Sequence, residues 1–212
     1  MNSYTMHSIQ GEIMNMQNEL NQLIKETIAP LFKAKGFKKK GKNFAKLFPD
    51  FAWTVNIQSS KWNTKNEVEF LFNTGIYCDK VYTTLDGLKS PIFPLELYSM
   101  LRLRISDIKN IRENWYKISD KTDIEEIKKQ VESDIVNVIL PYFEQYQNVE
   151  DIINVLEIMD EKGEFECPHH LTLLYHYYGY PEKAQKRMRE VYLTSQKEYI
   201  KELATKIGIN VD

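Results

Sequence analysis

Apolar residues recur at spacings of three and four along the first part of the chain, which is the pattern of one face of an amphipathic helix. This pattern predicts a helix over residues 9–35, and Gly36 is placed to end it. Pro30 falls inside this helix and has no backbone N–H, so a kink or a restart is expected there. The apolar positions are Ile13, Met16, Leu20, Leu23, Ile24, Ile28 and Leu31.

Aromatic and β-branched residues then dominate three successive stretches, residues 44–48, 51–60 and 67–78, which we interpret as antiparallel strands. Pro49-Asp50 suits a tight turn between the first two. Apolar residues alternate with arginines at 101–105, which indicates a fourth strand. Residues 115–119 are expected to form a fifth, short strand.

Helical spacing returns after these strands. Thr122 and Glu125 have the sequence of a capping box, and Asn148 suits the N-cap of the following helix. Two prolines suit the first position of later helices, the last of which is predicted over residues 182–206. These two residues are Pro168 and Pro181.

Helices on one side of an antiparallel sheet are the expected arrangement for this order of elements. We therefore expect an α+β fold, in which an N-terminal helix packs on a sheet of four or five antiparallel strands and a C-terminal helical bundle follows. The α+β domain is expected over residues 1–145, and a C-terminal helical appendage over 146–212.

Several short motifs in the first two thirds of the chain resemble those of a known family. They are Pro30 to Phe32, Gly36 to Phe44, Val55 to Ser59, Phe72 to Tyr77, and Arg102 to Ile108 followed by Trp115. Together they resemble the bacterial domain-of-unknown-function family 4304 over residues 10–145, and the chain from 146 to 212 departs from it. Because that family has no established activity, the resemblance implies an α+β architecture and a bacterial origin and assigns no catalytic residue.

The charges nearly balance, with 28 basic and 30 acidic residues and a net charge of −2, which excludes a polycation. They are unevenly placed, because residues 33–46 contain seven lysines and no acid, whereas residues 120–166 contain fourteen acidic and four basic side chains. Two distant cysteines, Cys78 and Cys167, argue against a disulfide scaffold and indicate a reducing compartment. No secretion signal or membrane-spanning pattern is present, so a cytoplasmic location is expected.

The lysine run at residues 33–46 is the strongest charge feature. Lysines attract phosphates as point charges, and Phe37 and Phe44 lie between them, where they are placed to stack on a base. The alternative is a solvated turn, since lysine is also favoured at sheet edges. The candidate anion-binding residues are Lys38, Lys39, Lys40 and Lys42.

A second candidate site follows from strand alternation, which places polar residues on the face opposite the apolar one. If Arg102 and Arg104 lie on a neighbouring strand, amides, a phenol and two guanidinium groups form a polar floor for a carboxylate or phosphate. The alternatives are the solvated side of a sheet, and pairing of the arginines with Glu67 and Glu69. The candidate residues are Asn56, Gln58, Asn73, Tyr77, Arg102 and Arg104.

Metal and catalytic motifs are absent from the sequence. Cys167, His169, His170 and His176 are clustered, but their spacing matches no zinc signature, so no metal and no cofactor is expected. The chain has no phosphate-binding glycine loop, zinc-protease motif or hydrolase elbow, and no catalytic residue is assigned.

The expected function is a non-catalytic binding or interaction module that recognises a protein or an anionic ligand through the sheet face and the basic loop. The rival is an enzyme acting on a phosphorylated or nucleic-acid substrate, with the arginines and lysines as anion clamps. Nucleic acid is the less favoured partner, no membrane association is expected, and a homodimer formed through the C-terminal helices is a further alternative.

Overall fold

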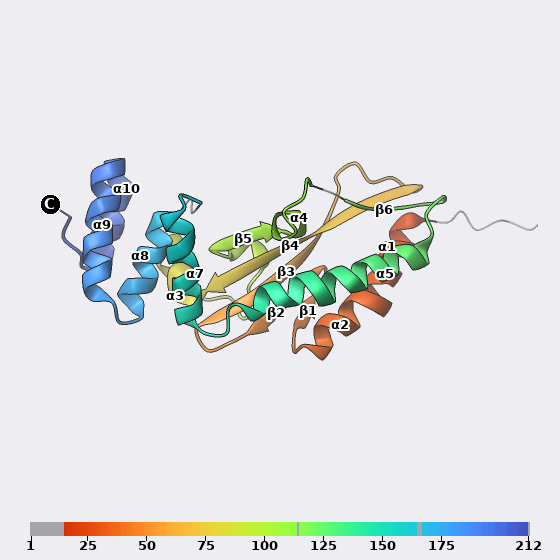
Figure 1. Ribbon diagram of the computed structural model, residues 1–212, viewed down its shortest axis with the longest axis horizontal. Coiled ribbons are helices and arrows are strands. Elements are labelled where there is room, and N and C mark those ends of the chain that lie inside the picture. The colour runs from red at the N-terminus through yellow and green to blue at the C-terminus, as the bar shows by residue number, and fades with distance from the viewer. Residues whose placement is uncertain (1–14, 114, 165–166, 212) are drawn as a thin grey trace, which may run out of the picture.

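The computed structural model of the protein describes residues 15–113, 115–164 and 167–211 (Figure 1). The start of the predicted N-terminal helix, residues 9–14, lies outside these ranges. The strands are β1 (Lys38–Lys40), β2 (Asn43–Leu47), β3 (Phe51–Ser59), β4 (Glu67–Cys78), β5 (Leu101–Arg104) and β6 (Tyr116–Ser119). The helical elements are α1 (Met16–Leu23), η1 (Ile24–Ile28), α2 (Ala29–Ala34), α3 (Asp79–Asp86), η2 (Glu96–Tyr98), α4 (Ile105–Ile108), α5 (Ile124–Asp134), η3 (Ile135–Ile139), α6 (Leu140–Glu144), α7 (Val149–Glu161), α8 (Pro168–Tyr177), α9 (Pro181–Ser195) and α10 (Glu198–Lys206).

The six strands form one antiparallel sheet in the order β1-β2-β3-β4-β5, and β6 pairs with the first residues of β4. This arrangement confirms the α+β fold with an antiparallel sheet. β1 was not predicted, because its three residues are all exposed lysines and carry no alternation of apolar and polar positions.

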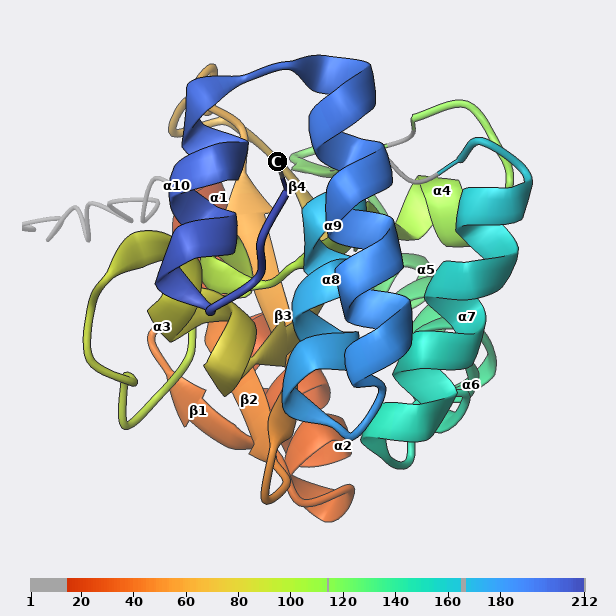
Figure 2. The same ribbon diagram turned by 90° about the vertical axis from the view of Figure 1, so that its left-hand side faces the viewer.

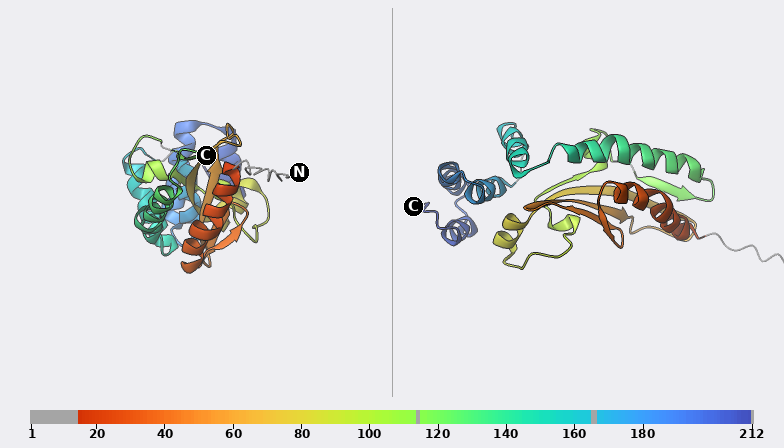
Figure 3. Two further views of the ribbon diagram at one scale, coloured as in Figure 1. Left: turned by 90° about the vertical axis from the view of Figure 1, so that its right-hand side faces the viewer. Right: turned by 90° about the horizontal axis from the view of Figure 1, so that it is seen from below.

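One side of the sheet, called here the helix side, is covered by two long helical segments, α1–η1–α2 and α5–η3–α6 (Figures 1 and 3). Phe32 of α2 packs on Phe44 and Phe72 of the sheet, and all three are fully buried. Trp53 stacks on Phe143 of α6 with ring centroids 5.3 Å apart, and its indole N–H donates to the carbonyl of Tyr146 at 2.9 Å. Packing of the N-terminal helix on the sheet is therefore confirmed.

Each covering segment contains a π-helical turn shortly before a proline. In the first, η1 precedes Pro30, and in the second, η3 precedes Pro141. Proline lacks the N–H of a regular helix, and its ring collides with the carbonyl four residues earlier, which a wider turn relieves. The kink or restart expected at Pro30 thus takes the form of a wide turn in an uninterrupted helical segment.

The opposite side of the sheet, called here the polar side, is covered at one end by α3 and the chain from Gly87 to Met100. Gly75 of β4 lies directly beneath Ser99, and a Cβ atom there would lie 2.5 Å from the Ser99 hydroxyl and 2.7 Å from that of Thr54. The hydroxyls of Ser99 and Thr54 are hydrogen-bonded at 2.8 Å, and Thr54 also bonds to the carbonyl of Gly75. Glycine therefore permits the close approach of this segment to the sheet.

The C-terminal helices α7 to α10 gather at one end of the sheet, so a C-terminal helical region is confirmed (Figures 1 and 2). Their buried residues, such as Leu156 and Leu173, belong to the same hydrophobic cluster as the helix side of the sheet. A boundary between two domains at residue 145 stays a prediction. No helix in the described part of the chain is long and apolar enough to cross a membrane.

Several helix boundaries can be compared with their predicted positions. Asn148 is the N-cap of α7, and Pro168 and Pro181 begin α8 and α9, as predicted. The N-cap of α5 is Asp123 and not Thr122, whose hydroxyl instead accepts the backbone N–H of Ser119. A single helix over 182–206 was wrong, because Gln196 adopts a left-handed conformation (φ 50°) between α9 and α10. The short helix α3 was not predicted.

Candidate functional site

The four candidate lysines lie on both sides of the sheet. Lys39 is opposite Phe44 in the register, which places it on the helix side, whereas Lys38 and Lys40 are opposite Ala45 and Asn43 and share the polar side. Lys42, at the turn of the β1–β2 hairpin, bonds through its ammonium group to the hydroxyl of Ser59. The lysine run is therefore divided between two surfaces.

Lys39 and Lys42 form part of a groove of about 430 Å³ between the hairpin and the first helical segment, called here the basic groove. Positions 21, 25, 29 and 33 follow one another at intervals of four along that segment and form the other wall. Burial lowers the pKa of Lys42. The lining residues are Asn21, Ile24, Lys25, Ala29, Lys33, Lys39, Gly41 and Lys42.

The electrostatics of the basic groove are one-sided. Its lining holds four lysines and no carboxylate. Among the described residues, none of these four lysines forms an ion pair. Four like charges on one concavity attract an anion, and the isolated charges are available to it.

The aromatic residues of the lysine run do not face this groove. Phe37 and Phe44 are 3% and 0% exposed and belong to the hydrophobic core, where both pack on Phe32. The expectation that these rings stack on a base was therefore wrong. Alternation explains the result, because apolar residues between lysines in a hairpin point into the core while the lysines remain solvated.

The predicted polar floor is present as a row of side chains across the polar side of the sheet. Asn56 lies between Asn43 and Asn73 in the register, and Asn73 is opposite Arg104. The amides bond to one another, from Asn56 to Asn43 and from Asn73 to Gln58, both at 2.8 Å. Each of these bonds uses a donor and an acceptor that a ligand would need. Much of the hydrogen-bonding capacity of these amides is therefore used within the protein.

The two arginines share the polar side, as the alternation indicated, but each has an acidic partner. Arg102 donates two hydrogen bonds to Glu96, which is nearly fully buried, and these bonds raise the pKa of Arg102. Arg104 pairs with Glu113. The proposed alternative of pairing with Glu67 and Glu69 was wrong, since Glu67 pairs with Lys117 of β6.

Tyr77 lies at the covered end of the polar side, where its hydroxyl donates to Asp79 at 2.9 Å and its ring packs on Tyr82. Burial, together with this carboxylate, raises the pKa of Tyr77. Its hydroxyl is therefore protonated and occupied, and it does not face the amide row. Binding by any of the predicted residues on the polar side stays a prediction.

The cysteine and histidine cluster does not form a recognisable metal centre. Within the described ranges, no group of three or more histidine, cysteine, aspartate or glutamate side chains is arranged to hold a metal ion. Cys167 is the N-cap residue of α8, and His169 and His170 lie in its first turn.

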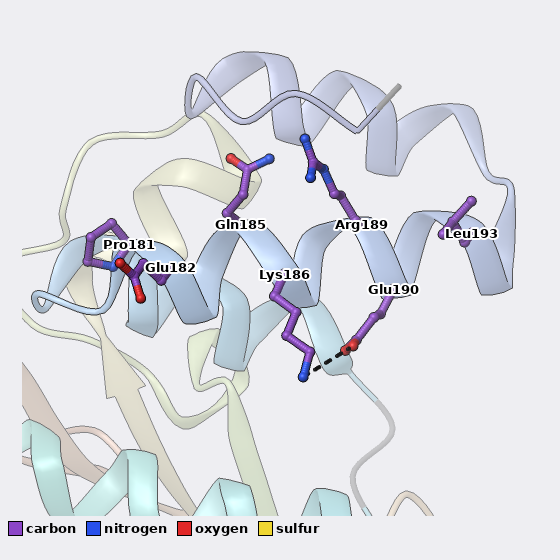
Figure 4. Close-up of a pocket in the computed structure, with 7 residues that line it drawn as sticks. All are labelled: Pro181, Glu182, Gln185, Lys186, Arg189, Glu190 and Leu193. Atoms are coloured by element: carbon purple, nitrogen blue, oxygen red, sulfur yellow. Dashed lines mark ion pairs between the residues drawn. The ribbon is translucent and has the colours of Figure 1, made fainter.

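A hollow of about 550 Å³ lies along the outer face of α9 (Figure 4). Most of its lining side chains already have partners within the chain. Gln185 and Arg189 both bond to the carbonyl of Asn210 at the C-terminal end, and Lys186 lies 3.9 Å from Glu190. Because all of these residues lie on one face of a single helix, the hollow is a feature of the surface and does not surround a ligand.

Lys25 is the groove residue that the sequence interpretation missed. The charge run was sought as a continuous segment, and Lys25 lies eight residues before its first member. The available signal was the separation of eight residues, or two helical intervals of four, that places Lys25 and Lys33 on one face adjacent to the apolar one. Glu96 and Glu113, the partners of the arginines, lie in non-periodic segments that gave no such signal.

The fold and the groove define an α+β protein with one polar sheet side, one helix-covered side and a basic concavity at the hairpin. Residues 28–145 match the sequence profile of the family described as Domain of unknown function (DUF4304). This match covers more than half of the chain, and the chain belongs to that family. No curated protein and no solved structure matches the chain.

Proposed function

We propose that the protein is a bacterial cytoplasmic binding module that takes a phosphate-bearing ligand in the basic groove, without catalysing a reaction on it. The observation that carries this proposal is the convergence of Lys25, Lys33, Lys39 and Lys42 from separate elements on one groove without a carboxylate. The two cysteines, Cys78 and Cys167, do not form a disulfide with each other, which supports a reducing compartment.

Phosphate suits this groove for physical reasons. Lysine is a flexible point charge that binds phosphate well, whereas the planar forks of Arg102 and Arg104, which suit carboxylates and phosphates alike, are paired with acids elsewhere. The volume of about 430 Å³ falls within the range of ~300–1,000 Å³ typical of small-ligand sites. A small phosphorylated molecule, or one phosphorylated side chain of a protein, has the matching size and charge.

Binding is favoured over catalysis because the only titratable side chains in the groove are its lysines. Its lining contains no carboxylate, histidine or thiol that could act with a lysine as the second member of an acid-base or nucleophile-base pair. A nucleic-acid ligand is less favoured, because the buried rings of Phe37 and Phe44 offer no stacking platform.

The hairpin provides a matched test, because its lysines alternate between two surfaces. Lys39→Glu with Lys42→Glu reverses charges in the groove, whereas Lys38→Glu with Lys40→Glu makes the same change in net charge on the polar side. Binding of pyrophosphate, of a nucleoside triphosphate and of a short single-stranded oligonucleotide is measured by calorimetry at about 50 and about 200 mM salt.

We expect the groove pair of substitutions to weaken binding of pyrophosphate or the triphosphate at least about tenfold, and the control pair to weaken it about twofold. Equal losses in both pairs would show that binding is a diffuse charge effect. Failure of the wild-type protein to bind any of the three probes at low salt would refute the proposal. Tighter binding of the oligonucleotide than of the triphosphate would support the nucleic-acid reading instead.

A further inference from the structure

The C-terminal helices border a second, partly open cavity of about 330 Å³, which is separate from the basic groove and lies outside the segment that matches the family. Its walls come from the first turn of α8, the last turns of α9 and the start of α10, which lie together at one end of the molecule (Figure 2). The lining residues are Pro168, His169, Arg187, Glu190, Val191, Thr194, Ser195, Lys197, Tyr199 and Ile200.

Two polar atoms in this lining have no hydrogen-bond partner within the described chain. They are Nδ1 of His169 and the hydroxyl of Ser195, and both are buried. A buried polar group without a partner destabilises a folded protein, and most such groups in folded proteins are satisfied. Two of them in residues that line one cavity leave hydrogen-bonding capacity that a bound molecule can satisfy.

The charged groups around the cavity are largely neutralised. Arg187 makes two hydrogen bonds of 2.6 Å to Asp160 and a third to the carbonyl of Pro168. Glu190 lies 3.9 Å from Lys186 on the outer face of α9, as drawn in Figure 4. Lys197 is exposed and lies over the ring of Tyr199. Burial lowers the pKa of His169, so its imidazole is neutral at pH 7.

The wall beside Ser195 is conformationally strained. Gln196, which follows Ser195, has φ 50° and ψ 28°, a left-handed conformation that is unfavourable for a residue other than glycine. Such strained residues cluster at ligand-binding segments. Because the Ser195 hydroxyl and Nδ1 of His169 are buried, a molecule in the cavity reaches them only if this turn moves.

We propose that this cavity binds a small uncharged molecule with an apolar body and one hydroxyl or amide group, which bonds to His169 and Ser195. The neutral imidazole and the hydroxyl can each donate or accept, which matches an amide or an alcohol. Val191, Ile200 and Pro168 provide the apolar wall, and the edge of Tyr199 lies near the ring of His169, with centroids 6.3 Å apart.

The test compares three ring compounds of similar size: benzamide, benzoate and toluene. Binding to the full chain is followed by chemical-shift changes of the His169 ring and of the backbone at residues 195–197. Benzamide is expected to bind at least about tenfold more tightly than toluene, since it supplies the missing hydrogen bonds, and more tightly than the charged benzoate.

Substitutions distinguish a ligand-binding site from a cavity whose polar atoms are unpartnered only because the wall is imperfectly packed. Ser195→Ala removes one of the two polar atoms and is expected to weaken benzamide binding about tenfold while raising the melting temperature of the free protein. His169→Asn keeps a polar atom close to the position of Nδ1 and is expected to retain binding, whereas His169→Phe abolishes it. Ser90→Ala, at an exposed position far along the chain, is the control and changes neither property.

The results of these binding measurements do not depend on whether the basic groove binds phosphate. Equal binding of benzamide to the wild-type protein and to Ser195→Ala would overturn it, as would absence of binding by benzamide at millimolar concentration. Tighter binding of benzoate than of benzamide would show that Lys197 and Arg187 make the cavity an anion site and would also overturn it.

Discussion

The two sides of the sheet achieve close packing by different means. The helix side is filled with aromatic and aliphatic side chains such as Phe44 and Phe72, whose burial is favourable in any orientation that excludes water. The polar side depends on hydrogen bonds with fixed partners, between Thr54 and Ser99 and between Arg102 and Glu96. The helix side therefore provides bulk stability, and the polar side determines which segment can lie on it.

Truncation of a central ring should cause the largest loss of stability, and this loss measures how much the packing of the helix side contributes. Phe72→Ala removes a fully buried ring that contacts Phe32, Phe70 and Tyr116, and it leaves a cavity. We expect the free energy of unfolding to decrease by about 3–5 kcal/mol in urea denaturation. Leu47→Ala, at the exposed end of β2, is the control and should cost about 0.5 kcal/mol or less. Similar losses in the two variants would contradict the assignment of the core.

Gly75→Ala should have the next largest effect and tests the polar side. The strand backbone at this position accepts any residue, so the expected loss of about 3 kcal/mol comes from the collision of the new methyl group with Ser99 and Thr54. The loss is measured by urea denaturation. Combining Gly75→Ala with Ser99→Gly removes the nearest atoms and should restore part of the stability. If the single variant is as stable as the wild-type protein, the covering segment does not lie as closely on the sheet as described.

A decrease in pH should cause a smaller loss of stability, through the buried imidazole of His170 near the start of β5. The pKa of His170 is lowered to about 4, mainly by burial and then by the neighbouring His169, while a hydrogen bond to the backbone of Met100 offsets part of the shift. Between the unfolded value of 6.5 and about 4, the unfolded chain binds a proton that the folded chain does not, so stability decreases as the pH falls through this range.

We expect the protein to lose about 2 kcal/mol between pH 7 and pH 5, as measured by denaturation at each pH. His170→Gln should reduce this dependence, whereas Phe72→Ala should lower stability equally at both pH values because it removes no titrating group. An undiminished pH dependence in His170→Gln would assign the effect to other groups.

The helix side could be predicted from the sequence more completely than the polar side. Alternation of Trp53, Val55 and Ile57 placed the apolar face correctly, because burial of apolar residues imposes a period of two on a strand. The partners of Arg102 and Arg104 could not be predicted, since they come from segments without periodicity whose path depends on the tertiary fold.

The candidate groove was predicted in part. The lysine run drew attention to Lys39 and Lys42, but their separation from Lys38 and Lys40 follows from the hairpin register, and the sequence did not indicate that residues 38–40 form a strand. The second cavity had no sequence signal, because it depends on where α9 ends, and Gln196 is not a residue that normally marks such an end.

The wide turns in the two covering helices also constrain how the gene can change. Each wide turn accommodates one residue more than a regular turn, so deletion of a single codon within η1 would return the segment to ordinary helical geometry. The same deletion would bring the ring of Pro30 against the carbonyl four residues before it. The wide turn and Pro30 are thus coupled, so deletion of one residue from η1 is expected to be tolerated better when Pro30 is replaced as well.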